Sequence, residues 1–335
     1  MKWQICDGVI YSRLNTIPNM QIAGFNLYGT IITADWKLMY PNTREKLKNL
    51  HDEGYMIVLF INRPNLIQKG KHVTFIDRIE ELIRRLSIPL EVYIATEDNR
   101  YMKPMTGMWE MCGRRTGIFC GDCAGRIYGK RDTDYNQCDR LFAINTRLKF
   151  YTPEQLFMQP ERPYRLPSGY LVPLINEEPF PWETLQRETK NKPHIIITVG
   201  CPVAWKSKVV EDIVIKFGRR NYFVVHDMEE LKIAMSERRN IIMDNRNPKR
   251  DHIYEELTQK YDRVILYFDF PKQLCMHLNH YRLQKYGEKK QSLWVFEKYY
   301  EQRVVPTEDE GVVLTIKPEN VLRELGEEYY FAYDI

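Results

Sequence analysis

The segment that decides the fold is a short apolar run followed by a polar turn, Ile22-Ala23-Gly24-Phe25-Asn26-Leu27-Tyr28-Gly29-Thr30. Its apolar residues predict a buried strand over Ile22–Leu27. Next come an amphipathic helical stretch over Arg44–Glu53, which Gly54 closes, and a second apolar run over Tyr55–Ile61. This order of strand, helix and strand predicts a parallel sheet with helices packed on its faces.

The same alternation continues along the chain. In the first half it predicts a helix around Thr74–Leu86 and strands over Glu91–Thr96 and Gly117–Cys120. In the second half it predicts, in order, strand His194–Val199, helix Lys206–Phe217, strand Tyr222–Val225, helix Asp227–Arg238, strand Asn240–Met243, helix Pro248–Lys260, strand Arg263–Phe268, two helices within Pro271–Arg303, strand Val312–Ile316 and a turn near Glu319.

Prolines separate these two halves. Seven of them fall between Pro160 and Pro193, a density that excludes regular helix and indicates an extended connection. We therefore expect a first domain over residues 1–158, a linker over 159–193 and a second domain over 194–335. The expected fold class is α/β, with two doubly wound parallel-sheet domains.

Length and composition are typical of a globular protein. The 335 residues fit two domains, and 44% hydrophobic with 28% charged residues leaves no sign of long disorder. The longest apolar runs, such as Met56–Ile61 and His194–Val199, are too short to cross a bilayer, and no signal peptide is evident at the N-terminus. We expect an intracellular protein, in nucleus or cytoplasm, without a membrane partner.

Cysteine content and charge carry little functional information. The seven cysteines form an odd set, and Cys120 and Cys123 make a lone CxxC that fits redox or zinc chemistry less well than a turn after a buried strand. No metal site is expected. The net charge of +4 permits contact with nucleic acid without requiring it.

Residues 23–30 resemble the A-G-F-D-L-D-G-T motif of haloacid-dehalogenase-type phosphatases. The resemblance places Asn26 at the position of the carboxylate nucleophile and Tyr28 at that of the general acid and base, with Thr30 retained. An amide is a poor nucleophile and supplies no anionic oxygen to magnesium. Tyrosine is badly matched to proton transfer at neutral pH.

Further segments resemble the polynucleotide kinase 3′-phosphatase family. Lys103 lies in a segment similar to the one with the phosphate-binding lysine, Asp122 in a turn similar to G-D-x-A-G-R, and Asp139 in the segment that follows it. Ile61 stands where the family has a threonine that holds phosphate. The resemblance implies a vestigial phosphatase site, in which Lys103 and Asp122 form a buried ion pair.

A second site is indicated by Gly200-Cys201-Pro202-Val203-Ala204-Trp205-Lys206-Ser207, which is similar to the phosphate-binding G-x-x-x-x-G-K-[ST] loop. Lys206 and Ser207 are retained, but Trp205 replaces a glycine, and an indole there is expected to block the phosphate nest. Its side chain could equally turn outward and stack on a base.

Three more segments support this second resemblance. Asp227 stands at the position of the family's general base, and Asp244 begins a segment similar to D-N-T-N-P. In the lid stretch, which contains Arg282, His280 replaces an arginine that would stabilise transferred phosphoryl charge. Together with Gly200, Lys206 and Ser207, these residues are interpreted as a vestigial nucleotide site.

These replacements lead us to expect a pseudoenzyme, without catalytic residues or a required cofactor, although weak magnesium or nucleotide binding stays open. The first functional expectation is a structural, self-assembling scaffold, such as a viral occlusion-body or matrix protein, because 22 tyrosines favour self-association. The alternatives are a module that binds nucleic-acid ends through the basic residues Arg282, Lys285, Lys289 and Lys290, or residual 5′-kinase activity. No phosphopeptide-binding module is expected.

Overall fold

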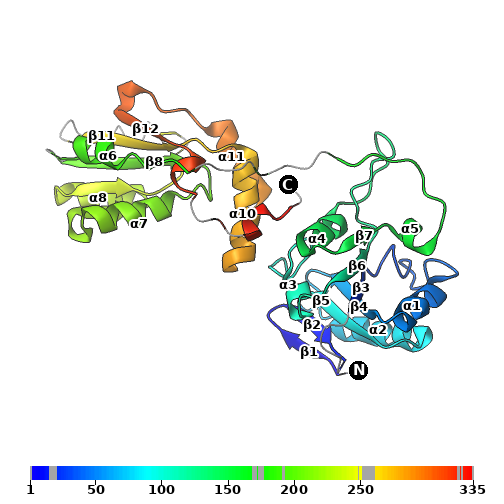
Figure 1. Ribbon diagram of the computed structural model, residues 1–335. Helices are drawn as coiled ribbons and strands as arrows, with labels where there is room; N and C mark the ends of the chain where they lie inside the picture. The colour runs from blue at the N-terminus through cyan, green and yellow to red at the C-terminus, as the bar shows by residue number, and fades with distance from the viewer. Residues whose placement is uncertain are drawn as a thin grey trace. The chain divides into compact units, whose positions relative to one another are not determined.

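The chain divides into two compact units in the computed structural model (Figure 1). The first unit comprises Met1–Leu171, Arg282–Lys289 and Tyr330–Ile335, and the second comprises Val172–Tyr281 and Lys290–Tyr329. The structure describes residues 2–14, 21–167, 172, 177–190, 193–247, 249–250, 261–322, 325 and 327–333.

A seven-stranded sheet forms the centre of the first unit, in the order β1-β2-β5-β4-β3-β6-β7. The strands are β1 Gln4–Cys6, β2 Val9–Ser12, β3 Ile22–Phe25, β4 Met56–Asn62, β5 Leu90–Ala95, β6 Gly117–Cys120 and β7 Lys149–Tyr151. The five strands from β3 to β7 run parallel, whereas β1 and β2 are antiparallel. Because β3 lies between β4 and β6, the winding of the chain reverses there, which is where ligands bind in such sheets.

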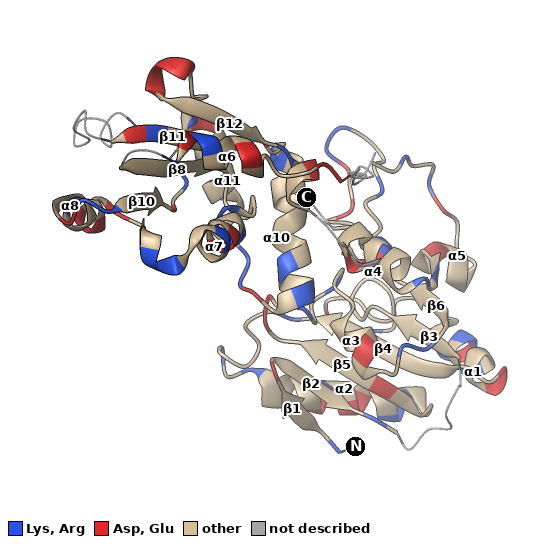
Figure 2. Ribbon diagram, turned by 60° about the vertical axis from the view of Figure 1, so that its left-hand side comes forward, with Lys and Arg blue, Asp and Glu red and all other residues tan. Residues whose placement is uncertain are grey.

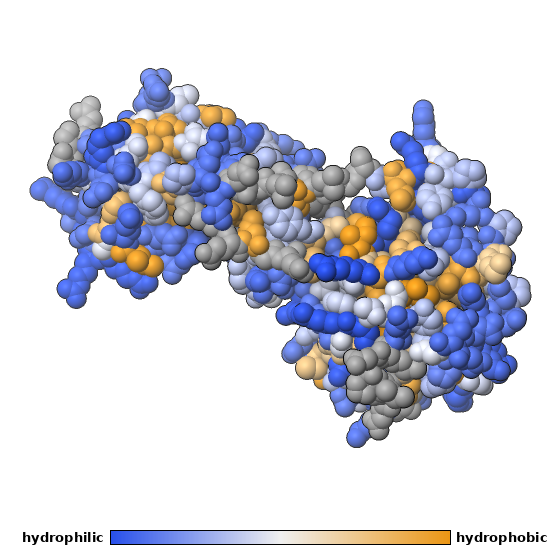
Figure 3. All heavy atoms as spheres, in the orientation of Figure 1, coloured by the Kyte–Doolittle hydropathy of each residue, from blue (hydrophilic) through white to orange (hydrophobic). Residues whose placement is uncertain are grey.

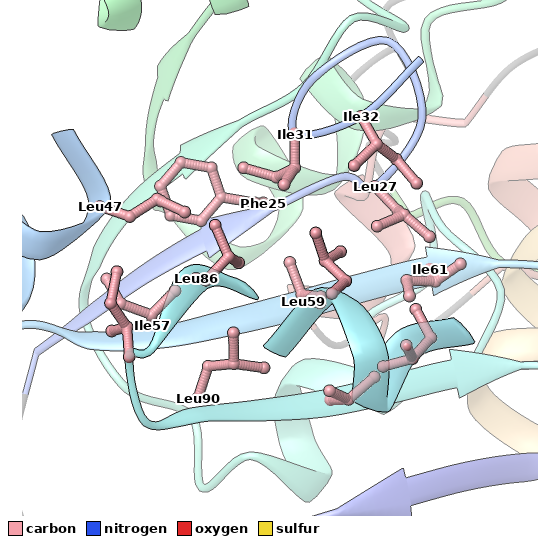
Figure 4. Close-up of a cluster of buried hydrophobic side chains, with 14 of the residues drawn as sticks. Phe25, Leu27, Ile31, Ile32, Leu47, Ile57, Leu59, Ile61, Leu86 and Leu90 are labelled. Carbon is pink, nitrogen blue, oxygen red and sulfur yellow. The ribbon is translucent and has the colours of Figure 1, made fainter. Parts of the chain in front are cut away.

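Both faces of this sheet are buried. The helices are α1 Thr43–Asp52, α2 His72–Leu86, α3 Gly107–Met111, α4 Cys138–Thr146 and α5 Pro153–Phe157. Alternate residues of β4 enter two cores: Leu59 packs with side chains of α1 and α2 (Figure 4), and Phe60 packs with Phe142 of α4. This two-sided burial explains the continuous apolar run that predicts β4.

The second unit is built on a five-stranded sheet, in the order β12-β11-β8-β10-β9, with every strand parallel to its neighbours. Its strands are β8 His194–Gly200, β9 Tyr222–Val225, β10 Asn240–Met243, β11 Asp262–Phe268 and β12 Val312–Ile316. The helices are α6 Trp182–Glu188, α7 Lys206–Phe217, α8 Met228–Ser236, α10 Lys272–Tyr286 and α11 Leu293–Gln302. The last turns of α10 fall in the segment grouped with the first unit.

These sheets confirm the expected α/β fold class. One expectation is wrong: α6 lies within the proline-rich range in which regular helix was excluded. Pro181 is the last proline before α6 and occupies the N-cap position of that helix. Residues 182–192 contain no proline. The helix expected over Pro248–Lys260 lies almost wholly outside the described residues. Among the described helices, none has the length and apolar character needed to span a bilayer.

Candidate functional site

Three polar side chains of the first unit meet at the carboxyl ends of β3 and β6. Asn26 follows β3 directly, and its Nδ2 donates to Asp122 Oδ1 at 2.7 Å and to the main-chain oxygen of Tyr28 at 3.0 Å. Thr30 donates to the same Asp122 oxygen at 3.2 Å. The parallel strands therefore bring Asn26, Thr30 and Asp122 together as the sequence motifs predict.

Lys103 forms the buried cationic side of this cluster. Its Nζ donates to Asp139 Oδ1 at 2.6 Å and to Asn26 Oδ1 at 3.1 Å, and the Lys103 and Asp139 side chains are 1% and 0% exposed. Burial alone would lower the pKa of Lys103, but the nearby acidic groups and the hydrogen bond to Asp139 together raise it. The buried ion pair of Lys103 is thus with Asp139, and the expected pair with Asp122 is replaced by the Asn26 bridge.

Asp122 is the carboxylate that faces Asn26, and its surroundings disfavour its charged form. Burial, followed by the charge of Asp139, raises the pKa of Asp122. Gly29 is required beside it, because a Cβ at Gly29 would lie 2.5 Å from Asp122 Oδ2, and its φ is +69°. Asn26 therefore stabilises a carboxylate that the surrounding protein would otherwise tend to protonate.

Magnesium does not fit this arrangement as it stands. A hard cation needs oxygen ligands, and Asp122 Oδ1 and the Tyr28 main-chain oxygen are of that kind. The N–H groups of Asn26 already occupy the space between these two oxygens, and Asn26 Oδ1 faces the Lys103 ammonium. An amide donor thus stands where a cation would need an oxygen.

Three residues near the site were not predicted from the sequence to belong to it. Asn62, the last residue of β4, accepts from the Lys103 N–H and donates to the Lys103 carbonyl, both at 2.9 Å. Cys123, Cys138 and Asp139 bring two thiols and a carboxylate within 4.8 Å of one another. The free thiol of Cys123 therefore lies near that of Cys138 in α4, a proximity that sequence spacing does not reveal.

The side chains of Tyr28 and Ile61 make packing contacts and are not placed for acid or base chemistry. The Tyr28 ring meets the Trp36 ring edge-on at 5.8 Å, and burial raises the pKa of its hydroxyl. Ile61 is buried in the hydrophobic core of β4. Tyr28 therefore forms part of an aromatic wall, and Ile61 contributes packing.

In the second unit, the loop over Gly200–Ser207 joins β8 to α7. Its backbone is left-handed at Val203 and at Trp205, both with φ of +60°. Lys206 opens the helix, and its Nζ folds back to donate to the Cys201 carbonyl at 2.7 Å. Burial lowers the pKa of Lys206 to about 8. The loop thus adopts its tight curve without the second glycine of the motif.

Trp205 packs beside this loop. Its ring stacks with Tyr281 at 6.4 Å and 23°, and it lines a small cavity together with Phe180 and Trp182. These contacts place the indole against α6 and α10. Ser207, two residues after Trp205, is exposed at the start of α7.

Two carboxylates lie at the ends of neighbouring strands. Asp227 follows β9 and caps α8, because its Oδ1 accepts from the N–H groups of Glu229 and Glu230 at 2.9 Å each. Asp244 follows β10, and its carbonyl lies 3.1 Å from His226 Nδ1. The sheet therefore places both acids at the edge from which the Lys206 loop departs.

His280 and Arg282, the two residues expected in the lid, belong to different units. Burial lowers the pKa of His280 to about 3, so its ring is neutral at physiological pH. Arg282 pairs with Glu288 and belongs to the segment Arg282–Lys289 that groups with the first unit. Basic residues of this segment are visible on the last turns of α10 (Figure 2). Within the second unit, the charge of Asp244 acts on Lys206, whereas Asp227 follows β9, one strand further along the sheet, and caps α8.

Comparison with known proteins identifies the family. The family model described as polynucleotide kinase 3 phosphatase matches residues 21–157, which contain Asn26, Lys103, Asp122 and Asp139. Residues 21–157 therefore match this family. The bifunctional polynucleotide phosphatase/kinase of Schizosaccharomyces pombe is 25% identical, over 93% of this chain and 83% of the relative.

Two further relatives each match less than half of the chain. Polynucleotide 3′-phosphatase ZDP of Arabidopsis thaliana is 33% identical, over 47% of this chain and 27% of the relative. An uncharacterized 20.8 kDa protein of Autographa californica nuclear polyhedrosis virus is 34% identical, over 44% of this chain and 92% of the relative. The family resemblance inferred from the motifs is thereby confirmed.

These relatives correct the expectation that the chain is a pseudoenzyme, because the relative that matches 93% of it is named as an enzyme with both activities. Replacement of single side chains in a motif does not by itself remove a site. The loop before α7 illustrates the error, since Trp205 adopts the left-handed backbone that the motif normally assigns to glycine.

Proposed function

We propose that the protein acts on polynucleotide ends and that its second unit transfers a phosphoryl group from a nucleoside triphosphate to a 5′-hydroxyl. The observation that carries this proposal is the buried Lys206 ammonium at the start of α7, folded into the loop that follows β8. A helix N-terminus with a cation in its first turn favours phosphate. The name of the S. pombe relative supports the substrate class.

The remaining residues of this site have matching roles. Lys206 would bind the transferred phosphoryl group, and Asp227 would accept the proton of the attacking hydroxyl. Ser207 and Asp244 offer hydroxyl and carboxylate oxygens of the kind that magnesium prefers, so they would hold an ion bound with the nucleotide. Such an ion neutralises phosphate charge when it is present.

Phosphorylation of a 5′-hydroxyl oligonucleotide with labelled ATP and magnesium tests the proposal. Lys206→Met should lower the rate about a hundredfold or more, because it removes the cation at the phosphate. Lys208→Met is the matched control: Lys208 lies two residues away on the same helix, exposed and paired with Glu211 and Asp212. Absence of transfer by the wild-type protein, or equal rates for all three proteins, would reject this function.

A self-assembling structural role, as in a viral occlusion body or matrix, is the second candidate. It is favoured by the 22 tyrosines of the chain, because tyrosine supplies a large contact area with a polar tip. Large apolar side chains also reach the surface, with Tyr135 95% and Met158 84% exposed. Figure 3 shows orange hydrophobic areas among the blue hydrophilic surface of each unit.

Light scattering over a range of protein concentrations tests this second role. Tyr135→Ser with Met158→Ser should shift assembly to higher concentration if these side chains make contacts between copies. A particle mass that stays that of the monomer at every concentration would reject the structural role, whatever the outcome of the kinase assay.

A further inference from the structure

Two free thiols lie close together beside the polar cluster of the first unit. Cys123 lies in the turn after β6, and Cys138 is the first residue of α4. Their sulfur atoms and a carboxylate oxygen of Asp139 all lie within 4.8 Å of one another. The two cysteines are 15 positions apart in the sequence, so the fold and not a local motif brings them together. Cys123 and Cys138 are termed the thiol pair.

Main-chain hydrogen bonds hold the two segments of the thiol pair against each other. The Cys123 carbonyl accepts from the N–H groups of Asp139 and Arg140, at 3.0 Å and 3.3 Å. The Cys123 N–H in turn donates to Asp139 Oδ2 at 3.0 Å. Segments held this closely suit a disulfide, which requires two Cα atoms within about 7 Å of each other.

The thiol pair differs from the other cysteines in its exposure. Four of the seven cysteines are buried: Cys112, Cys120, Cys201 and Cys275. Cys6 is exposed, but it lies on β1, which four strands separate from β6. Cys123 and Cys138 are both partly exposed, so a small oxidant can reach two neighbouring thiols there. Cys120, the CxxC partner of Cys123, belongs instead to the hydrophobic core.

The surroundings of the thiol pair favour a disulfide over a bound metal ion. Both oxygens of Asp139 are engaged, Oδ1 by the Lys103 ammonium at 2.6 Å and Oδ2 by the Cys123 N–H at 3.0 Å. Cys138 Sγ lies 3.9 Å from that same Oδ1, so a cation between the two atoms would compete with the ammonium. The N-terminus of α4 adds partial positive charge. A disulfide is neutral and leaves the buried ion pair of Lys103 intact.

We propose that the thiol pair is a site of reversible oxidation, at which hydrogen peroxide joins Cys123 and Cys138 in a disulfide. The Cys138 sulfur attacks one peroxide oxygen, the O–O bond breaks, and a sulfenic acid and one water are formed. The Cys123 sulfur then attacks the Cys138 sulfur, and the S–O bond breaks as the S–S bond forms. The departing oxygen takes the Cys123 proton and leaves as a second water. Two electrons from the two thiols thus reduce one peroxide.

The two thiols have different roles in this sequence of steps. The hydrogen bond with Cys138, followed by burial, raises the pKa of the Cys123 thiol. Cys123 is therefore the weaker nucleophile toward an oxidant in solution, and the first step is assigned to Cys138. The second step takes place between neighbouring atoms of one molecule, and this proximity offsets the low reactivity of Cys123.

Oxidation links two segments that carry acids of the polar cluster. Asp122 precedes Cys123 in the turn after β6, and Asp139 follows Cys138 in α4. The disulfide closes a loop between these segments and so restricts the unfolded chain. The oxidised protein should therefore resist heat better than the reduced one.

Peptide mapping of the full-length protein tests the proposal. Reduced protein is treated with hydrogen peroxide, its free thiols are blocked with N-ethylmaleimide, and trypsin should then release two peptides linked through Cys138. Trypsin leaves Cys120 and Cys123 in one peptide, so variants identify the partner. Cys120→Ser should still form the link, whereas Cys123→Ser and Cys138→Ser should not. Dithiothreitol should separate the peptides.

Thermal unfolding gives a second measurement. Peroxide should raise the Tm of the wild-type protein by about 5 °C, and this rise should be absent from Cys138→Ser. Cys6→Ser is the matched control and should respond as the wild-type protein does. Absence of the linked peptide, or its loss in Cys120→Ser, would overturn the proposal. Zinc that protects both thiols of the reduced protein from N-ethylmaleimide would also overturn it, because the cluster would then be a metal site.

Discussion

The side-chain amide of Asn26 connects Asp122 to Lys103. Its Nδ2 donates to Asp122 Oδ1 at 2.7 Å, and its Oδ1 accepts from Lys103 Nζ at 3.1 Å. One neutral group thus satisfies a buried carboxylate and a buried ammonium at once. An amide suits this position because its two ends have opposite hydrogen-bonding character.

Asn26→Asp should convert this bridge into a cation site. The second carboxylate replaces the N–H donors, so Asp122 loses its hydrogen bond and two anions face each other. We expect the variant to be less stable than the wild-type protein without divalent ions, and to gain thermal stability with millimolar magnesium. Magnesium titration by calorimetry and thermal unfolding measures both effects.

The control for this substitution is Asn26→Asp combined with Asp122→Asn, which restores one carboxylate and one amide. This pair should lose most of the magnesium-dependent stabilisation. If wild type and Asn26→Asp respond identically to magnesium, the amide does not keep the ion out. A rise in 3′-phosphatase rate with Asn26→Asp would show that the nucleophile position is otherwise intact.

Lys103→Met should destabilise the first unit strongly. It leaves Asp139 as an unpaired charge that is 0% exposed, a change that costs about 3–5 kcal/mol when one partner of a buried pair is removed. Lys103→Met with Asp139→Leu should recover much of this loss, because no buried charge remains. Urea unfolding followed by tryptophan fluorescence gives the comparison.

The exposed pair of Lys37 and Asp35 supplies the control for Lys103. Their side chains are 80% and 58% exposed, so Lys37→Met should change the urea midpoint very little. A midpoint for Lys103→Met that lies close to that of Lys37→Met would contradict the assigned role of the buried pair.

The regular parts of the fold could be predicted because they depend on local pattern. The strand of Tyr222–Val225 and the helix of Lys206–Phe217 have the bounds that periodicity predicts. The β1–β2 hairpin was missed, since β1 is exposed throughout and β2 is fixed by pairing with the distant β5. Pairings between distant segments leave no local pattern to recognise.

In the candidate sites, too, some contacts could be predicted from the sequence and others could not. Asn26 and Asp122 could be placed together because both follow parallel strands, which puts them at one edge of the sheet. The contact between the Trp36 and Phe75 rings could not be predicted, because Trp36 reaches Phe75 only through an irregular turn with positive φ. Such a turn is set by tertiary packing and not by a glycine that the sequence would reveal.

Lys206 should make nucleotide binding depend on pH. Burial lowers the pKa of Lys206 to about 8, below its ordinary value near 10.5, so the free protein loses this charge as pH rises through 8. Phosphates favour the charged form, and affinity for ATP should therefore fall by at most about tenfold per pH unit above pH 8. Calorimetric titration between pH 7.5 and 9.5 would measure this.

Two variants test the origin of that dependence. Lys206→Arg stays charged throughout and should show a flat profile, whereas Lys208→Met should retain the wild-type slope. Without ligand, the unfolded chain binds more protons than the folded one between pH 8 and 10.5, so this residue makes stability rise with pH in that window. A wild-type affinity that does not change across pH 8 would exclude Lys206 from the phosphate contact.

Trp205→Gly should strengthen nucleotide binding at the loop before α7. Glycine adopts the observed φ of +60° without the penalty of a bulky side chain, and it removes an indole next to the phosphate-binding backbone. Loss of the stacking contact with Tyr281 should lower thermal stability at the same time. Trp205→Ala separates the two effects, because alanine removes the indole but keeps the left-handed penalty. We expect ATP affinity in the order glycine, alanine, tryptophan, measured by calorimetry, and weaker binding by Trp205→Gly than by the wild-type protein would mean that the indole itself contacts the nucleotide.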